Sequence, residues 1–580
     1  MVDFRKAILL LAVLVFATGV ASAQQALSCT LNGGAPPLLR AEGVAEEIGQ
    51  AFITCTGGTP TAASVPVPRI NVRVFTPGYN ITSRLLGTGA KVSVAGASEA
   101  TLLIDDPAPT AQNLATWPTP PACAAPYSGA VCGNMFLANQ VSGNTQAIEW
   151  LDIPFDPPGT TTSRTLRFVN IRVNAALATG GNVTSLVPPP VNILVSITGT
   201  FTLPITSPFL TVGYIQNGLG FSIRGTASTR PAISAVNLAQ CVTPLNPTFY
   251  ARFSELFANS FRIRGGGTGT TFPIGPPFQN NLNQIFNTES MFFGAPSGSG
   301  DPAYHNILAG QATQGTRLRL AFQNLPSGVG ITVPTTATVG GPGTLTLQLV
   351  APGVDGSTAS ATGVVSLTGG AGLAVYEVTD GNPGASESID LAVQVTYSGL
   401  PALGSGNVLG SYAPLSSTDV ASSSAPVPRF IQNPAATFPI NVAACETRLL
   451  FPFVTSIPGW DTGIAISNTT VDPFGTAAQN GACTLHFYGS PSNSTQTSST
   501  ISAGSQLLFA MSQGNAAQNI NALTGFTGYL IARCNFQYAH GYAFISDLGV
   551  NKYAQGYIAL VIGGGLTSRY SLNPAEALDQ

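Results

Sequence analysis

Apolar and polar residues alternate along much of this chain. In residues 192–203, with the sequence NILVSITGTFTL, the apolar positions fall on every second residue, and residues 388–397 repeat the pattern as SIDLAVQVTY. The apolar positions of the first segment are Ile193, Val195, Ile197, Phe201 and Leu203. Because successive side chains of a strand point to opposite faces of a sheet, this period predicts β-strands with one buried face.

The segments between these runs are rich in turn-forming residues. Examples are DPPGTT at 156–161 and TDGNPG at 379–384, in which Gly, Pro, Asn and Asp supply the backbone geometry of turns. We therefore predict a mainly β protein, with two or three β-sandwich-like domains, Gly/Pro-rich turns and at most short helices.

One stretch departs from the strand period. In FYARFSELFANSFRIR, residues 249–264, Phe253, Leu256, Phe257 and Phe261 stand at helical spacing. This spacing predicts a short amphipathic helix near 250–263 that packs on a sheet.

The length of 580 residues suits several domains of about 100–200 residues each. We divide the chain into an N-terminal β-sandwich-like domain over 24–230, a middle β-rich domain over 231–440 and a C-terminal β-domain over 441–580. The Ser/Ala/Pro-rich segment 416–430 precedes the last domain and is typical of a linker or an edge segment.

The first 23 residues predict a signal peptide. Arg5 and Lys6 precede an apolar run over 7–20, and Ala21-Ser22-Ala23 fits the small-residue rule for cleavage. No later run reaches the ~18 unbroken apolar residues of a membrane helix. We expect an exported chain with no transmembrane helix after cleavage.

The composition narrows the classes of partner. Charged residues make up 8% of the chain and hydrophobic residues 44%, with a net charge of −3, whereas about a quarter of residues are charged in ordinary soluble domains. Nucleic-acid binding needs clustered Lys and Arg and is not expected. A weakly charged surface offers little repulsion between copies, so self-association is physically easy.

Eight cysteines in an exported chain predict disulfides. Sequence alone leaves the connectivity open, but pairing neighbours along the chain gives Cys29–Cys55, Cys123–Cys132, Cys241–Cys445 and Cys483–Cys534.

The segment GWDTGIAISN contains Asp461-Thr462-Gly463, a triplet that also carries the catalytic carboxylate of aspartic proteases. That chemistry needs two carboxylates sharing one proton, and the triplet occurs once here. We favour a structural role in which Asp461 caps a turn and Gly463 supplies its backbone angles. Trp460 and Asp461 remain the candidate binding residues, and no catalytic residue is assigned.

The sequence also offers two possible metal sites, one for zinc and one for calcium. A zinc site could be formed by Cys483, His486, Cys534 and His540. However, Cys483 and His486 are three residues apart, and residues three apart on a strand face opposite sides of the sheet. Export also favours a disulfide between the two cysteines. The acidic runs could brace loops through structural calcium; their members are Glu42, Glu46, Glu47, Asp105 and Asp106. We expect no metal or other cofactor, with calcium kept as the alternative.

The segments LLFPFVTSIPGWDTGIAISNTTVDPFGTAAQNGACTLHFYG and GYLIARCNFQYAHGYAFISDLG, at 449–489 and 528–549, resemble a domain of uncharacterised secreted multidomain β-rich proteins of environmental bacteria. The resemblance implies an exported, multidomain β-protein, and it brings no catalytic or binding residues with it.

These observations favour an exported, non-enzymatic extracellular or cell-surface protein with a structural or adhesive role, whose partners are polysaccharide, cell-envelope components or further copies of the chain. A carbohydrate-binding protein with exposed aromatic residues is the first alternative. An extracellular hydrolase with an unrecognised site, in which His305 and Asp301 form a candidate pair, is the second. The periplasm is the alternative location.

Overall fold

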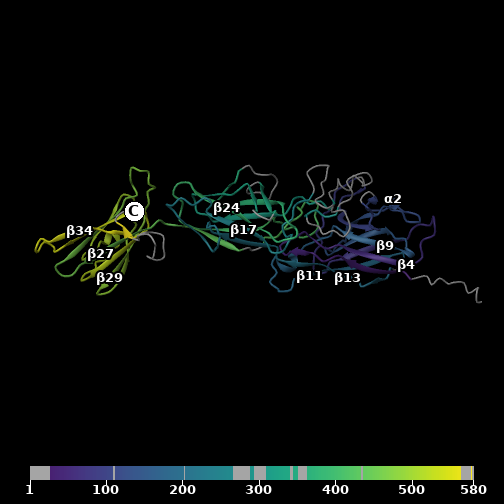
Figure 1. Cartoon of the computed structure of the whole chain (residues 1–580), viewed down its shortest axis with the longest axis horizontal. Helices are drawn as coiled ribbons and strands as arrows, with labels where there is room; N and C mark the ends of the chain where they lie inside the picture. The colour runs from purple at the N-terminus through teal and green to yellow at the C-terminus, as the bar shows by residue number, and fades with distance from the viewer. Residues whose placement is uncertain are drawn as a thin grey trace, which may run out of the picture.

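The computed structural model describes residues 26–89, 91–108, 111–200, 203–265, 288–292, 309–339, 344–350, 362–432, 436–562 and 576–577. The expected signal peptide over 1–23 and the pair Asp301 and His305 lie outside them. Three bodies follow one another in chain order along the molecule, as Figure 1 shows. We name them the N-terminal body (26–217), the middle body (218–444) and the C-terminal body (445–562 with 576–577).

The chain is mainly β, as predicted. In the described residues the helical elements are α2 (Gly129–Cys132), α3 (Ala176–Thr179) and the 3-10 turn η2 (Ala516–Gln518). No helix among the described residues has the length and apolar character needed to cross a membrane.

An eleven-stranded sheet forms the N-terminal body. Its order is β12 (Ile205–Thr206), β1 (Ser28–Gly33), β4 (Ala51–Gly57), β9 (Gly159–Val169), β6 (Ser98–Ile104), β7 (Met135–Gln140), β8 (Ala147–Pro154), β5 (Arg69–Phe75), β11 (Pro190–Gly199), β13 (Phe209–Gln216) and β2 (Leu38–Arg40). A two-stranded ladder pairs β3 (Glu46–Glu47) with β10 (Arg172–Val173). Strands from both ends of the large sheet contribute to one core, in which the ring centroids of Trp150 and Phe168 lie 5.2 Å apart.

Two sheets enclose the core of the middle body. The first has the order β15 (Ala232–Ile233), β14 (Leu219–Arg224), β17 (Phe249–Glu255), β24 (Ser388–Tyr397), β19 (Val329–Thr332) and β22 (Val364–Val365). The second has the order β16 (Val236–Ala239), β26 (Thr437–Ala443), β25 (Gly404–Ala413), β18 (Arg317–Gln323), β23 (Gly372–Asp380), β21 (Thr346–Val350) and β20 (Thr336–Thr338). Strand β14, which our sequence division placed in the first domain, is hydrogen-bonded to β17 here.

The segment expected as a helix near 250–263 contains strand β17 and a following turn, so that prediction was wrong. Phe249, Ala251, Phe253 and Glu255 are buried in alternation along β17. The strand pairs with β14 on one side and β24 on the other. Its apolar residues fit the period of two as well as the helical one, and hydrogen bonding on both edges favours the strand.

Two sheets also enclose the core of the C-terminal body. Their orders are β30 (Ser494–Thr497), β29 (Cys483–Ser490), β32 (Thr527–Cys534), β27 (Thr447–Thr455), β35 (Leu560–Ile562) and β36 (Glu576–Ala577), and β31 (Gln506–Ala510), β28 (Asp461–Asn468), β33 (Ala539–Ser546) and β34 (Ala554–Ile558). Side chains of both sheets form its apolar core, Leu449 and Phe451 from β27 meeting Ile464 and Ile466 from β28.

Four disulfides join the eight cysteines in the order expected from neighbouring positions. Two of them, Cys29–Cys55 and Cys483–Cys534, link residues directly opposite each other on adjacent antiparallel strands. The Cys241–Cys445 bond spans 204 residues of sequence. Because β16 and β26 are parallel neighbours, their C-terminal ends lie side by side. The disulfide therefore joins the end of β16 to the chain that leaves β26 for the C-terminal body.

Buried charges connect the N-terminal and middle bodies. Nη1 of Arg40 lies 2.7 Å from Oε1 of Glu289, and its Nη2 lies 2.8 Å from Oε1 of Glu46. These side chains are at most 1% exposed. The guanidinium of Arg40 also lies over the ring of Phe430, 4.8 Å from its centroid. Because unpaired buried charges are costly, this pairing ties the two bodies together.

Three of the acidic residues weighed as calcium ligands, Glu42, Glu46 and Asp105, lie in ion pairs or backbone contacts. Glu46 faces Arg40, and Glu42 accepts the backbone N–H of Gly218, at 3.1 Å, where the chain passes from one body to the next. Asp105 pairs with Arg164 at 2.6 Å.

The segment 416–430, expected as a linker or an edge segment, packs onto the N-terminal body. Its Arg429 is 1% exposed and donates to the carbonyl oxygens of Thr418 and Val420. The backbone N–H of Val44 donates to the carbonyl oxygen of Arg429 at 2.9 Å. The segment therefore closes the junction between the first two bodies.

Candidate binding site in the C-terminal body

The loop between β27 and β28 carries Trp460, one of the two candidate binding residues. The register of β27 against β32 shifts between Phe451 and Val454, and Phe453 within the shift is 50% exposed. At the base of the loop the N–H of Thr455 donates to Oγ1 of Thr462, whose hydroxyl donates back to the carbonyl of Thr455. These bonds fix the ends of the loop, and Trp460 is 37% exposed.

A pocket of about 500 Å³ opens beside this loop. Its apolar walls include Phe453, Ile457, Trp460 and Tyr553. Tyr557 of β34 donates its hydroxyl to the carbonyl oxygen of Phe453. Burial raises the pKa of Tyr557 to about 12, so the phenol keeps donating even at a pH near 10, where an exposed tyrosine is half ionised. A largely apolar concavity of this size is typical of a small-molecule binding site.

Asp461, the other candidate, is buried and does not line this pocket. One carboxylate oxygen accepts the backbone N–H groups of Thr462, at 2.9 Å, and Ser512, at 3.1 Å. The other accepts the hydroxyl of Ser512 at 2.6 Å. These bonds hold the start of β28 against the turn that follows β31, which accounts for the carboxylate in structural terms.

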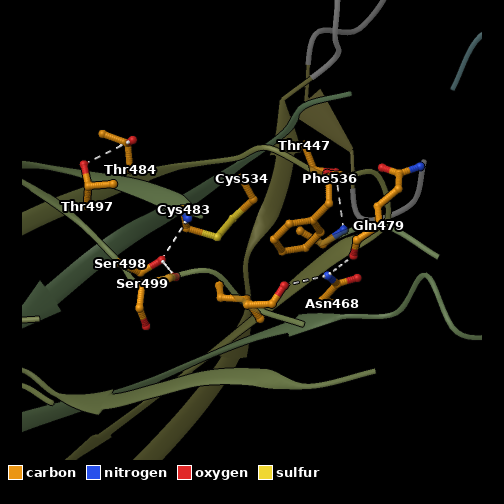
Figure 2. The surroundings of a disulfide bond; sticks show 12 residues. Thr447, Asn468, Gln479, Cys483, Thr484, Thr497, Ser498, Ser499, Cys534 and Phe536 are labelled. Atoms are coloured by element: carbon orange, nitrogen blue, oxygen red, sulfur yellow. Dashed lines mark hydrogen bonds between the residues drawn. A yellow bond between two sulfur atoms is a disulfide. The ribbon is translucent and has the colours of Figure 1, made fainter. Parts of the chain in front are cut away.

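The cysteines of the zinc hypothesis are bonded to each other, as Figure 2 shows. The N–H of Cys483 donates to Oγ of Ser498 at 2.9 Å, and Nδ2 of Asn468 donates to the carbonyl of Gln479 at 2.7 Å. The disulfide uses both thiols that a zinc site would need. Within the described residues, no group of three or more His, Cys, Asp or Glu side chains is arranged to hold a metal ion.

Exposed aromatic residues concentrate in the C-terminal body. Across the described part of the chain, eleven Phe, Tyr and Trp side chains are exposed, and Phe209 and Tyr214 are the two outside this body. The other nine are Phe453, Trp460, Phe474, Tyr488, Tyr529, Tyr538, Tyr542, Phe544 and Tyr553. Tyr488 and Tyr529 stack on each other, with ring centroids 5.2 Å apart.

The open face of the four-stranded sheet forms a second apolar surface. Ala465 of β28 stands opposite Leu508 of β31 on one side and Tyr542 of β33 on the other. The exposed fractions of Leu508, Tyr542 and Phe544 are 48%, 46% and 44%. Because Gly463 and Ala465 are small, these larger side chains flank a shallow trough along β28. We call this surface the β28 trough.

Sequence reasoning did not find the β28 trough. In GYAFI, residues 541–545, both sets of alternate positions are apolar, so the period does not show which set faces water. The sizes of the side chains indicate which set faces water. A Cβ placed on Gly541 would lie 2.5 Å from Cζ of Phe451, so the inner position accepts only a small residue and the large rings of Tyr542 and Phe544 take the outer one.

No family model matches the sequence, and no curated protein matches it. Among solved structures, one match is the C-terminal domain of the Streptococcus pyogenes antigen I/II-family protein AspA. The two share 7% sequence identity with a TM-score of 0.24, and the match covers 72% of this chain and 99% of that chain. A TM-score this low does not establish a shared fold.

Proposed function

We propose that this chain is an exported, non-enzymatic surface or extracellular protein that adheres through its C-terminal body. The observation that carries the proposal is the concentration of exposed aromatic side chains there. Exposed apolar patches on soluble proteins mark interaction surfaces. Aromatic side chains supply large contact area at low cost in conformational entropy.

The disulfides support export. Four of them connect the eight cysteines of the sequence, and disulfides persist in oxidising compartments outside the cytosol. The buried junction around Arg40 favours a scaffolding role for the first two bodies, because it ties them into one unit that carries the adhesive body.

Adsorption of the purified protein to the producer's own envelope tests the adhesive function. The triple variant Leu508→Ser, Tyr542→Ser, Phe544→Ser removes the large side chains of the β28 trough. Phe209→Ser is the matched control, because Phe209 is 55% exposed but lies in the N-terminal body. We expect the triple variant to lose about tenfold in retention, about 1.4 kcal/mol, and the control to match wild type. Equal retention of all three proteins would refute adhesion through this face.

Carbohydrate binding at the Trp460 pocket is the second candidate function. The observation that favours it is the set of three aromatic side chains, Phe453, Trp460 and Tyr553, around one pocket of about 500 Å³. Retention on one insoluble polysaccharide that is lost in Trp460→Ala, and kept in the triple variant of the β28 trough, would support this function. Envelope retention that is indifferent to Trp460→Ala but lost in the triple variant would assign adhesion to the trough.

A further inference from the structure

Two turns lie together at one end of the C-terminal body. One joins β27 to β28 (456–460), and the other joins β33 to β34 (547–553). They are neighbours because Asp461, the first residue of β28, stands opposite Ser546, the last residue of β33. Strand β27 starts beside Cys445, where this body is attached, and the turns lie at its other end. Figure 1 shows β34 at the far end of the elongated molecule. We call the two turns together the distal tip.

The large side chains of the distal tip are apolar and face water. Val550 is 76% exposed and Leu548 is 66% exposed, and Tyr553 is exposed at the end of the same turn. Ile457 and Trp460 are exposed in the other turn. Exposed apolar side chains that gather in one place on a protein mark a surface that contacts a partner.

Little charge accompanies these apolar side chains. The two turns contain two charged residues, Asp547 and Lys552. Asp547 is buried, whereas Lys552 is exposed. The distal tip therefore presents apolar groups with a single positive charge, and the negative charge is turned inward.

The inward carboxylate satisfies the backbone of the turn. It accepts the N–H of Gly549 at 3.0 Å and the N–H of Asn551 at 2.5 Å. Three further N–H groups also find acceptors within the hairpin: Leu548 donates to Oγ of Ser546, Val550 to the carbonyl of Asp547, and Asp547 to the carbonyl of Tyr553. Five consecutive amides thus need no water. A turn with this property can leave water for lipid, where an unsatisfied backbone group has no partner.

Leu548 occupies an unfavourable backbone conformation. Its φ is 56°, in the left-handed region, and Gly549 follows with a φ of 87°. Glycine and asparagine adopt this region readily, whereas a bulky residue rarely does. The leucine is thus unfavourable both in its backbone and in its exposure to water. Strain of this kind persists where function requires it, and a contact made by the leucine side chain would account for both features.

We propose that the distal tip inserts into the surface of a lipid bilayer. Leu548 and Val550 then lie among the upper acyl carbons, as the apolar groups of interfacial proteins do. Trp460 and Tyr553 lie at the level of the head groups, the depth that tryptophan and tyrosine favour. Lys552 meets the lipid phosphates. The inference rests on the proposed adhesion of the C-terminal body and names a lipid surface for it, through a part of the body other than the β28 trough.

Flotation of the full chain with vesicles of phosphatidylcholine and phosphatidylglycerol, mixed 3:1, tests the proposal. We expect wild type to float with the vesicles. Leu548→Asn is the deciding variant, because asparagine accepts a positive φ and the fold is not weakened. It should unfold at the same temperature as wild type or higher, and bind the vesicles about tenfold more weakly, since a large apolar side chain is lost.

A pair of valines supplies the matched comparison. Val550→Ser should weaken vesicle binding about fivefold. Val471 is 62% exposed and follows the opposite end of β28, so Val471→Ser should bind as wild type does. Lys552→Asn should reduce binding to these vesicles by about fivefold, the contribution of one basic side chain near an anionic surface.

Tryptophan fluorescence reports the depth of insertion. The other two tryptophans, Trp117 and Trp150, belong to the N-terminal body. Vesicles of brominated phosphatidylcholine, with phosphatidylglycerol in the same proportion, should therefore quench emission in wild type and not in Trp460→Phe. Leu548→Asn should reduce the quenching in proportion to its weaker binding.

Three outcomes would overturn the proposal: wild type that does not float, Leu548→Asn that floats as wild type does, or quenching that persists in Trp460→Phe. Envelope retention that is lost in Leu548→Asn, without any vesicle binding by wild type, would assign the distal tip to a protein or polysaccharide partner instead. Failure of vesicle binding is distinguishable from failure of adhesion, because the envelope assay with the β28 trough variant leaves the distal tip intact.

Discussion

Arg40 and Glu289 form a buried ion pair across two bodies, with 2.7 Å between Nη1 and Oε1. We predict that Arg40→Met lowers the free energy of unfolding by about 3–5 kcal/mol, because it leaves Glu289 buried without its partner. Urea unfolding measures the change. Arg73→Met is the matched control: Arg73 pairs with Glu149 at the surface and is 44% exposed, so its loss should cost under about 1 kcal/mol. Equal losses in the two variants would contradict the role assigned to the junction.

Glu47 makes stability depend on pH with a defined sign. Burial raises its pKa in the folded chain from 4.5 to about 8, so folding takes up a proton between these values. The free energy of unfolding therefore falls as the pH rises through this window, on the order of 1.4 kcal/mol per pH unit. Glu47→Gln should remove this part of the slope. Parallel stability curves for wild type and variant between about pH 5 and pH 8 would show that Glu47 does not titrate there.

The Cys483–Cys534 bond closes a loop of 51 residues in the C-terminal body. Replacing both cysteines by Ala should destabilise this body by about 4 kcal/mol, since the open chain gains entropy when unfolded. Hydrogen exchange of peptides from 447–562 reports the change locally. The double replacement of Cys123 and Cys132, in the N-terminal body, is the control and should leave these peptides as protected as in wild type.

Asp461 is expected to matter for stability and not for peptide cleavage. Asp461→Ala leaves the N–H and hydroxyl of Ser512 and the N–H of Thr462 without their acceptor, at a cost of about 1–3 kcal/mol. Ser512→Ala removes only the hydroxyl and should cost less. Thermal unfolding ranks the two variants. A peptidase activity present in wild type and lost in Asp461→Asn, with stability unchanged, would instead restore the protease hypothesis.

The strands could be predicted because the alternation that indicates each strand lies within its own residues. Along β24 the buried residues are Ile389, Leu391, Val393 and Val395, which are the positions that the alternation marks. In β17 the same local information was ambiguous, since Phe253 and Phe257 fit a helix while Phe249, Ala251 and Phe253 fit a strand. The neighbouring strands β14 and β24 decided the outcome.

The buried junction and the candidate binding surfaces could not be predicted, because each depends on residues that lie far apart in the sequence. Arg40 and Glu289 are 249 residues apart, and the sequence around either residue does not indicate that the other is its partner. Trp460 was a candidate because it stands beside the Asp-Thr-Gly triplet and an aromatic side chain can stack on carbohydrate. Its pocket also needs Tyr553, which only the pairing of β33 with β34 brings near.

The bond between Cys241 and Cys445 also defines a path for mechanical load. If the C-terminal body holds a surface while the rest of the molecule is pulled away, tension passes through the sulfur atoms and bypasses the chain between them. That chain spans 204 residues, which at ~3.4 Å each would otherwise add about 700 Å of extension. A C-terminal body attached in this way transmits force without drawing length out of residues 242–444, and reduction of this one bond would return those residues to the path of the load.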